Sequence, residues 1–179
     1  MTVSRVRRKC FISYHHEDEQ EVSRFIQTFD HAHDVFIARG IGAGMPGDVI
    51  GSKDRDYIMR RVRELYLRDS TVTIVMIGKC TWARRYVDWE IASTLRDDAR
   101  NRRSGLLGIV LPSAANAPKA PERLQDNLGT SLNPGYAHWY HYPRSTAQLS
   151  SMIETAYSTR DRVAPKNDRL LFSYNRGCR

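Results

Sequence analysis

Long hydrophobic runs are missing from this sequence of 179 residues. The longest, residues 72–77, is interrupted by Thr73 and falls far short of the roughly 20 apolar residues that cross a bilayer. The basic residues 1–9 are not followed by the apolar core of a secretory signal, because the apolar stretch 10–14 stops at His15. We therefore expect neither a membrane partner nor a secretory signal.

Cysteine is also scarce. Cys10, Cys80 and Cys178 are too few and too scattered for a zinc site or a disulfide framework. The acidic residues show no spacing typical of metal ligands either. These absences predict a cytoplasmic protein of a reducing compartment with no bound metal.

Acidic residues are outnumbered, 20 against 28 basic ones, which leaves a net charge of +8. Such a balance favours anionic partners such as nucleotides, nucleic acid or acidic proteins, although a solvated basic surface explains it equally well. The basic residues are spread along the chain rather than gathered in one stripe, which argues against nucleic acid as a partner.

What the chain does contain is an alternation of short apolar runs with amphipathic stretches. The runs predict strands at residues 9–14, 35–38, 70–77, 106–111 and 138–142. Helices are expected from Asp18, with Glu21 as a capping-box partner, from about Ser52, over 82–100 and over 146–160. Residues 112–137 hold four of the seven prolines and read as a long loop.

This order predicts an α/β fold, a three-layer sandwich with a five-stranded parallel sheet. We divide the chain into a basic extension (1–8), one domain (9–160) and a basic tail (161–179). If the strand order is 2-1-3-4-5, a ligand crevice lies where the first and third strands end. Tyr14 and His15 would then face residues 78–81.

The predicted helix 82–100 holds the strongest candidate for chemistry. With about 100° per residue, Val87, Ile91 and Leu95 share the face toward the sheet, and Glu90 lies at the edge of that face. A carboxylate turned toward a core is costly unless it is paired, so Glu90 is either a functional group or an edge glutamate whose head reaches water. Trp82 and Tyr86 could form aromatic walls for a flat ring, or simply pack.

Two other patterns carry less information. The stretch from Gly42 through Gly44 to Gly47 matches G-x-G-x-x-G, but it follows the second strand and contains Pro46, so we interpret it as a mobile lid or assembly loop rather than a dinucleotide fingerprint. His15 and His16 at a strand end could supply a general base.

The first strand, with Phe11, Ser13, Tyr14, His15 and Asp18, resembles the opening F-x-S-[FY]-H-x-x-D of the TIR-like proteins of Thoeris antiphage defence. The segment 70–91, with Tyr86, Val87, Trp89 and Glu90, is similar to that family's third strand and following helix. The resemblance extends over about residues 8–111.

The resemblance implies a flavodoxin-like fold and an NAD+ glycohydrolase or ADP-ribosyl cyclase. NAD would be a substrate and no cofactor would be needed. The product would be an ADP-ribose derivative, often cyclic, that activates a partner effector. The catalytic glutamate of the family falls on Glu90, and the substrate-binding positions fall on Ser13, Tyr14 and His15, with Gly44 in the loop.

The chemistry of such a reaction suits a carboxylate. Nicotinamide needs no general acid to leave, because it departs from a cationic group, and a nearby negative charge stabilises the developing oxocarbenium. A flexible glycine loop predicts low basal turnover that rises on self-assembly or ligand binding. The rival interpretations are a non-catalytic interaction module and a basic nucleic-acid binder.

Overall fold

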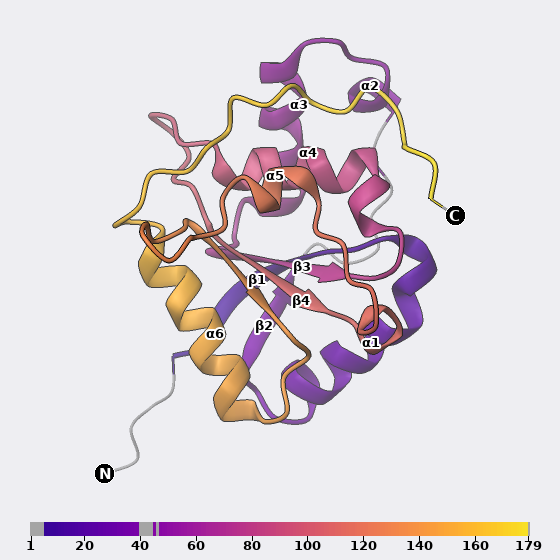
Figure 1. Cartoon of the computed structure of the whole chain (residues 1–179). Helices are drawn as coiled ribbons and strands as arrows, with labels where there is room; N and C mark the ends of the chain where they lie inside the picture. The colour runs from indigo at the N-terminus through magenta and orange to yellow at the C-terminus, as the bar shows by residue number, and fades with distance from the viewer. Residues whose placement is uncertain (1–5, 40–44, 46, 179) are drawn as a thin grey trace.

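The computed structural model describes residues 6–39, 45 and 47–178, so Gly44 and most of the glycine loop lie outside the described residues. One parallel sheet runs through the centre in the order β2-β1-β3-β4-β5 (Figure 1). The strands are β1 (Arg8–Ser13), β2 (Phe36–Arg39), β3 (Val72–Ile77), β4 (Gly105–Val110) and β5 (Ala137–Tyr140).

Helices and single turns connect these strands. The α-helices are α1 (Glu19–Ile26), α2 (Gly47–Ile50), α3 (Arg55–Val62), α4 (Arg85–Leu95), α5 (Glu122–Gln125) and α6 (Thr146–Thr159). The 3-10 turns are η1 (His16–Asp18), η4 (Thr81–Ala83) and η5 (Pro112–Ala114), and the π-helical turns are η2 (Gln27–His31) and η3 (Arg63–Leu67).

The predicted α/β sandwich and strand order are confirmed. β1 pairs in parallel with β3, with Cys10 beside Val72 and Ser13 beside Val75. β5 pairs with β4 at one edge, and β2 pairs with β1 at the other. Because β1 and β3 are parallel neighbours, their carboxyl ends lie side by side. We call this side of the sheet, where the strands end, the carboxyl edge, and it is here that open parallel sheets bind ligands.

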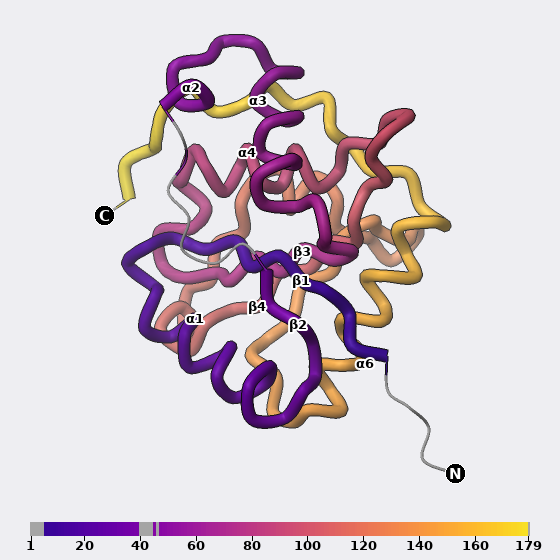
Figure 2. The backbone as a smooth tube through the Cα atoms, turned by 180° about the vertical axis from the view of Figure 1, so that it is seen from behind, coloured from indigo at the N-terminus to yellow at the C-terminus, as the bar shows by residue number. Residues whose placement is uncertain are grey.

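Side chains alternate along each strand, so the two faces of the sheet pack against different helices and contribute to three buried clusters. α1 and α6 cover one face, where Ile12 and Ile74 belong to a single buried cluster with both helices. α3, α4 and α5 cover the other face (Figures 1 and 2). There Phe11 packs with Val62 and Trp89. The sheet is thus buried on both faces, as the nearly continuous apolar strand β3 indicates.

Two helices differ from the prediction for identifiable reasons. α4 ends at Leu95 rather than near residue 100, because the Asp98 carboxylate accepts the backbone N–H groups of Arg100 and Asn101 and stabilises a turn instead. After α3, the π-helical turn fits one extra residue into the helical turn, which rotates the following side chains relative to the buried face. Leu67 is therefore buried, while Leu65, which regular helical spacing would place on the same face as Ile58 and Val62, is 42% exposed.

The proline-rich segment 112–137 is more ordered than the prediction of a long loop. η5 and α5 lie within it, and Arg123 and Leu124 of α5 are buried. Leu124 joins the cluster formed by α4 and the strands β3 and β4. The sequence prediction missed α5 because a single four-residue turn has no periodicity to detect.

The cysteine interpretation was wrong in one respect. Cys80 and Cys178 form a disulfide with their Cα atoms 5.6 Å apart, while Cys10 is free and buried. Residues 98 positions apart in the chain give no sequence signal of pairing. The disulfide removes the argument for a reducing compartment that rested on unpaired cysteines.

The segment after α6 packs against the protein rather than trailing from it. In both backbone views it crosses the layer formed by α3, α4 and α5 (Figures 1 and 2). Among the residues described, no helix has the length and apolar character that a membrane span requires.

Candidate functional site

The centre of the candidate site is the pair formed by Ser13 and Glu90. Ser13 is the last residue of β1 and is buried, and Glu90 lies in the middle of α4. The Ser13 hydroxyl donates a hydrogen bond of 2.5 Å to Oε2 of Glu90. The packing of α4 on the sheet through Val87 and Ile91 turns Glu90 toward the carboxyl end of β1.

The Glu90 carboxyl group has a strongly shifted pKa. The residue keeps a partly exposed surface, but its carboxyl group is surrounded by protein, and this burial raises its pKa to about 8. The hydrogen bond from Ser13 acts in the opposite direction, because it favours the charged form. Among the described residues, no lysine or arginine forms an ion pair with Glu90. A carboxyl group with these properties is a functional-site candidate.

Two tyrosines lie within the electrostatic reach of Glu90. Burial raises the pKa of Tyr14, and the charges of Glu19 and Glu90 raise it further. Burial and then the Glu90 charge also raise the pKa of Tyr66, which follows α3. The Tyr66 ring lies 6.3 Å from that of Phe11. Tyr66 was not among the predicted site residues, since nothing in the local sequence connects it with Glu90.

A second contact joins the ends of β1 and β3. The Thr81 hydroxyl donates to Oδ2 of Asp18 at 3.3 Å and accepts the backbone N–H of Gly78 at 2.9 Å. A Cβ on Gly78 would collide with the Asp18 carboxylate, so glycine is needed for this approach. The expected capping box is absent, because Asp18 is the N-cap of α1 but its side chain makes no cap hydrogen bond.

Burial raises the pKa of Asp18, and the Thr81 hydroxyl opposes that shift. The sequence pattern predicts a helix cap at Asp18, but the side chain contacts Thr81 instead. The signal for its actual role was its place in the strand-end motif, at the edge where ligands bind.

The histidine pair lies just after β1. His15 is buried, and burial, followed by the charges of His16 and Arg84, lowers its pKa. His15, His16 and Glu17 each place one potential ligand atom within 4.8 Å of the others, a spacing that suits a metal ion and that the sequence did not suggest. His16 and Glu17 are exposed, and exposed acidic groups often cluster in this way without a metal.

The two predicted aromatic residues have different neighbours. Tyr86 packs against the cluster of Phe11 and Trp89, and its ring centroid is 5.7 Å from that of Trp89. Trp82 lies in η4, and Nζ of Lys119 sits 3.2 Å from the centroid of its ring. The substrate-binding roles of both residues stay predictions, as do those of Ser13, Tyr14 and His15.

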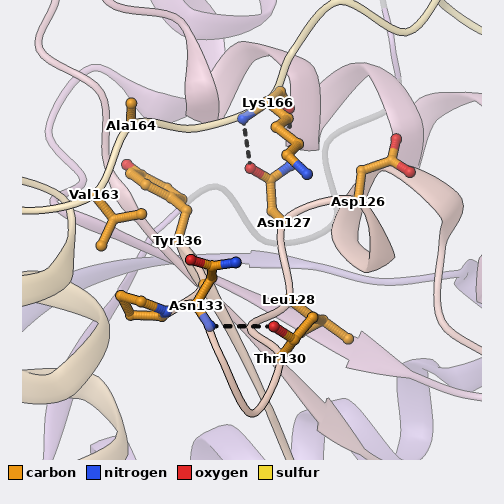
Figure 3. Close-up of a pocket in the computed structure, with 11 residues that line it drawn as sticks. Asp126, Asn127, Leu128, Thr130, Asn133, Tyr136, Val163, Ala164 and Lys166 are labelled. Atoms are coloured by element: carbon orange, nitrogen blue, oxygen red, sulfur yellow. Dashed lines mark hydrogen bonds between the residues drawn. The ribbon is translucent and has the colours of Figure 1, made fainter.

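A cavity of about 260 Å³ lies away from this site (Figure 3). Residues 126–136, which precede β5, form one wall, and residues 163–166 form the other. Asn127 holds the two walls together by accepting the backbone N–H of Lys166 at 2.8 Å. Because the cavity lies before β5, it is at the amino edge of the sheet, opposite to Ser13 and Glu90.

The sheet order, the two covering layers and a carboxyl group at the carboxyl edge define an α/β domain of the flavodoxin-like kind. Residues 11–116, more than half of the chain, match the family described as Thoeris protein ThsB, TIR-like domain. The chain belongs to this family. No curated protein matches it. The matched region contains Ser13, Asp18 and Glu90, and ends before α5, α6 and the C-terminal segment.

Proposed function

We propose that this chain is an NAD-consuming signalling enzyme of antiphage defence. It would cleave the bond between nicotinamide and ribose and make an ADP-ribose-derived messenger, cyclic in form, for a partner effector protein. The observation that carries this proposal is the pairing of Ser13 with a half-buried Glu90 at the carboxyl edge of the sheet. Membership of the Thoeris ThsB family supports the role in defence.

The geometry suits stabilisation of a positive charge. As the nicotinamide leaves, the ribose develops oxocarbenium character, and a carboxylate in a poorly solvated position stabilises that charge more strongly than one in water. The substrate itself carries a cationic nicotinamide. On binding, this charge would lower the pKa of Glu90 and favour the carboxylate form.

The residues at the end of β1 have supporting roles in this proposal. The Ser13 hydroxyl orients the carboxyl group of Glu90, and Tyr14 with His15 follows directly at the strand end. The substrate-binding role of Gly44 stays a prediction from the resemblance, because Gly44 lies outside the described residues. The proposal places the chain in the cytoplasm, where NAD is available, with self-assembly or ligand binding as the activating step.

The decisive experiment compares wild type with Glu90→Gln under activating conditions. The amide keeps the shape and can still accept from Ser13, but it removes the charge. Loss of one well-placed electrostatic group costs on the order of 100- to 1,000-fold in rate. Glu64→Gln is the matched control, because Glu64 lies on the neighbouring η3 with an exposed side chain paired to Arg61. Mass spectrometry of the products identifies nicotinamide and the ADP-ribose derivative.

A folded Glu90→Gln that retains most of the NAD turnover would show that Glu90 is not the catalytic carboxylate. The main alternative is a non-catalytic interaction module. An ion pair between Glu90 and a basic side chain such as Arg39 or Arg85 would have favoured it. Arg85 instead donates to the carbonyl of Ser173, and Arg39 to that of Ala38.

A further inference from the structure

The C-terminal segment 167–178, which we term the strap, follows α4 in the antiparallel direction. Asn167 lies at the C-terminal end of α4, where its side-chain amide donates to the carbonyl of Ala92 at 2.9 Å. Near the other end, the backbone N–H of Arg176 donates to the carbonyl of Ala83 at 2.8 Å. The strap therefore spans the whole length of the helix that carries Glu90.

The strap supplies a cap that α4 lacks. The N-cap residue of α4 is Arg84, whose side chain makes no cap hydrogen bond. Instead, Oδ1 of Asn175 accepts the backbone N–H of Arg85, the first residue of the helix, at 2.9 Å. The first N–H groups of a helix have no partner within it, so an external acceptor stabilises the first turn.

The middle of the strap is fixed to α4 by buried polar contacts. The indole N–H of Trp89, the residue before Glu90, donates to the carbonyl of Phe172 at 2.9 Å. The Asp88 carboxylate accepts the backbone N–H of Phe172 at 2.9 Å. Arg123 of α5, which is 1% exposed, pairs with Asp88 at 2.8 Å and donates to the carbonyls of Arg169 and Leu170.

The far end of the strap is closed covalently. Cys178 is bonded to Cys80, which lies three residues beyond β3 and next to Thr81, the partner of Asp18. The disulfide therefore ties the strap to the edge of the sheet where Ser13 and Glu90 meet. The family match ends at residue 116, so the strap lies outside it.

We propose that the strap is a positioning element for Glu90, and that the Cys80–Cys178 disulfide makes this positioning sensitive to the redox state. The proposal rests on the proposed function for its effect on turnover, but its structural part stands independently. With the disulfide closed, α4 is capped and held from end to end. With it open, the first turn of α4 and the carboxyl group of Glu90 gain freedom.

The redox step is a simple exchange. A dithiol reductant such as dithiothreitol breaks the Sγ–Sγ bond, supplies two electrons and two protons to give two cysteine thiols, and is itself oxidised to its cyclic disulfide. Disulfides of cytoplasmic proteins are often of this reversible, redox-sensing kind.

The test uses the full-length protein, oxidised and reduced, with three variants. Cys178→Ser removes the covalent closure, and Asn175→Ala removes the cap on α4. Tyr174→Ala is the matched control, because its side chain is 74% exposed and lies beside Asn175 in sequence. Hydrogen exchange reports the protection of the α4 amides, and carboxyl-carbon NMR, assigned with Glu90→Gln, reports the titration of Glu90.

Asn175→Ala should lower protection in the first turn of α4 by roughly fivefold, the change that loss of a helix cap brings. Cys178→Ser should behave like the reduced wild type and no longer respond to dithiothreitol. In both variants, the Glu90 titration midpoint should fall by about one pH unit as the carboxyl group gains solvent. Tyr174→Ala should resemble wild type.

A strap with a merely structural role would lower the melting temperature without moving the Glu90 midpoint. An unchanged midpoint in Asn175→Ala, Cys178→Ser and reduced wild type would therefore overturn the proposal. At pH 9, where Glu90 is largely ionised in wild type and variants alike, NAD turnover should fall about tenfold with loss of alignment. If wild type consumes no NAD, the proposed function fails, while exchange and titration still decide whether the strap positions Glu90.

Discussion

The Ser13 hydroxyl and the Glu90 carboxylate, 77 residues apart in sequence, meet at 2.5 Å at the carboxyl edge of the sheet. Burial pushes the pKa of Glu90 up, and the hydroxyl pulls it down. The resulting value of about 8 leaves Glu90 largely protonated at neutral pH in the ligand-free protein. In the proposed reaction, the positive charge of bound NAD would favour the charged form at neutral pH.

The first prediction concerns the pH dependence of NAD turnover. Because the proposed reaction needs the carboxylate, kcat/KM should rise with pH and level off above about 8, following the Glu90 pKa of the free protein. The midpoint for kcat should lie lower, because bound nicotinamide is positively charged. Initial rates from pH 5.5 to 9.5 measure both. A kcat/KM that is constant across this range would contradict a catalytic Glu90.

Ser13→Ala should shift the pH profile of kcat/KM toward higher pH. The variant removes a hydrogen bond that favours the charged form, so the Glu90 pKa should rise by about one unit. Turnover should fall about tenfold at pH 7 and recover in part at pH 9. Ser23→Ala on the exposed face of α1 is the control. An equal loss at all pH values would mean that Ser13 acts through substrate binding and not through Glu90.

The proton on Glu90 should stabilise the fold but prevent turnover, so stability and activity should change with pH in opposite directions. The folded-state pKa is raised from 4.5 to about 8, so the proton binds more tightly to the folded protein. The stabilisation from this proton is complete below pH 4.5 and is lost as the pH rises toward 8. Glu90→Gln should therefore be more stable than wild type at pH 9, by about 2–4 kcal/mol, and equal to it near pH 4.5.

Thermal unfolding at pH 5, 7 and 9 measures this difference, with Glu64→Gln as the control. About 2–4 kcal/mol corresponds to a shift of roughly 5 °C or more in a chain of this size. A Glu90→Gln variant that is destabilised equally at every pH would show that the carboxyl group has a structural role.

The sheet and its order were predictable because apolar runs and their alternation with helices determine a parallel sheet with few alternatives. The position of Glu90 at the edge of the sheet-facing side of α4 followed from helical periodicity in the same way. The resemblance in the strand-end motif pointed to Ser13 as a substrate-binding position, but its hydrogen bond to Glu90 was not predicted. Each of these inferences depends on a local pattern or on topology.

The rest depends on contacts between distant segments. The Glu90 charge acts on Tyr66, which lies elsewhere in the sequence. Asp18 and Thr81 are 63 residues apart, and Cys80 and Cys178 are 98 apart, so only the finished fold brings each pair together. Asp18 shows the difficulty most clearly, because an acid before a helix is a good capping signal, yet its carboxylate is used elsewhere. The capping pattern was present, and a tertiary contact overrode it.

Gly78→Ala should test the contact between the two strand ends. The added methyl group would occupy the position of the Asp18 carboxylate and force it away from Thr81, at a cost of about 1–3 kcal/mol. Asp18→Ala should restore much of that loss in the double variant, because it removes the collision. Urea unfolding of the four proteins in the cycle gives the coupling energy. If the stability losses of the two single variants simply add in the double variant, the cost of Gly78→Ala does not come from a collision with Asp18.

The buried pair of Asp88 and Arg123 gives the last prediction. Both side chains are almost fully buried, and their atoms lie 2.8 Å apart, so removing one partner leaves an uncompensated charge. Arg123→Leu should therefore lower stability by about 3–5 kcal/mol. The double variant Asp88→Asn with Arg123→Leu should be more stable than Arg123→Leu alone, because no buried charge is left. Denaturant unfolding at pH 7 measures both. A double variant that is less stable than the single one would show that Asp88 stabilises α4 mainly by accepting the backbone N–H of Phe172, and that an asparagine does not replace this contact.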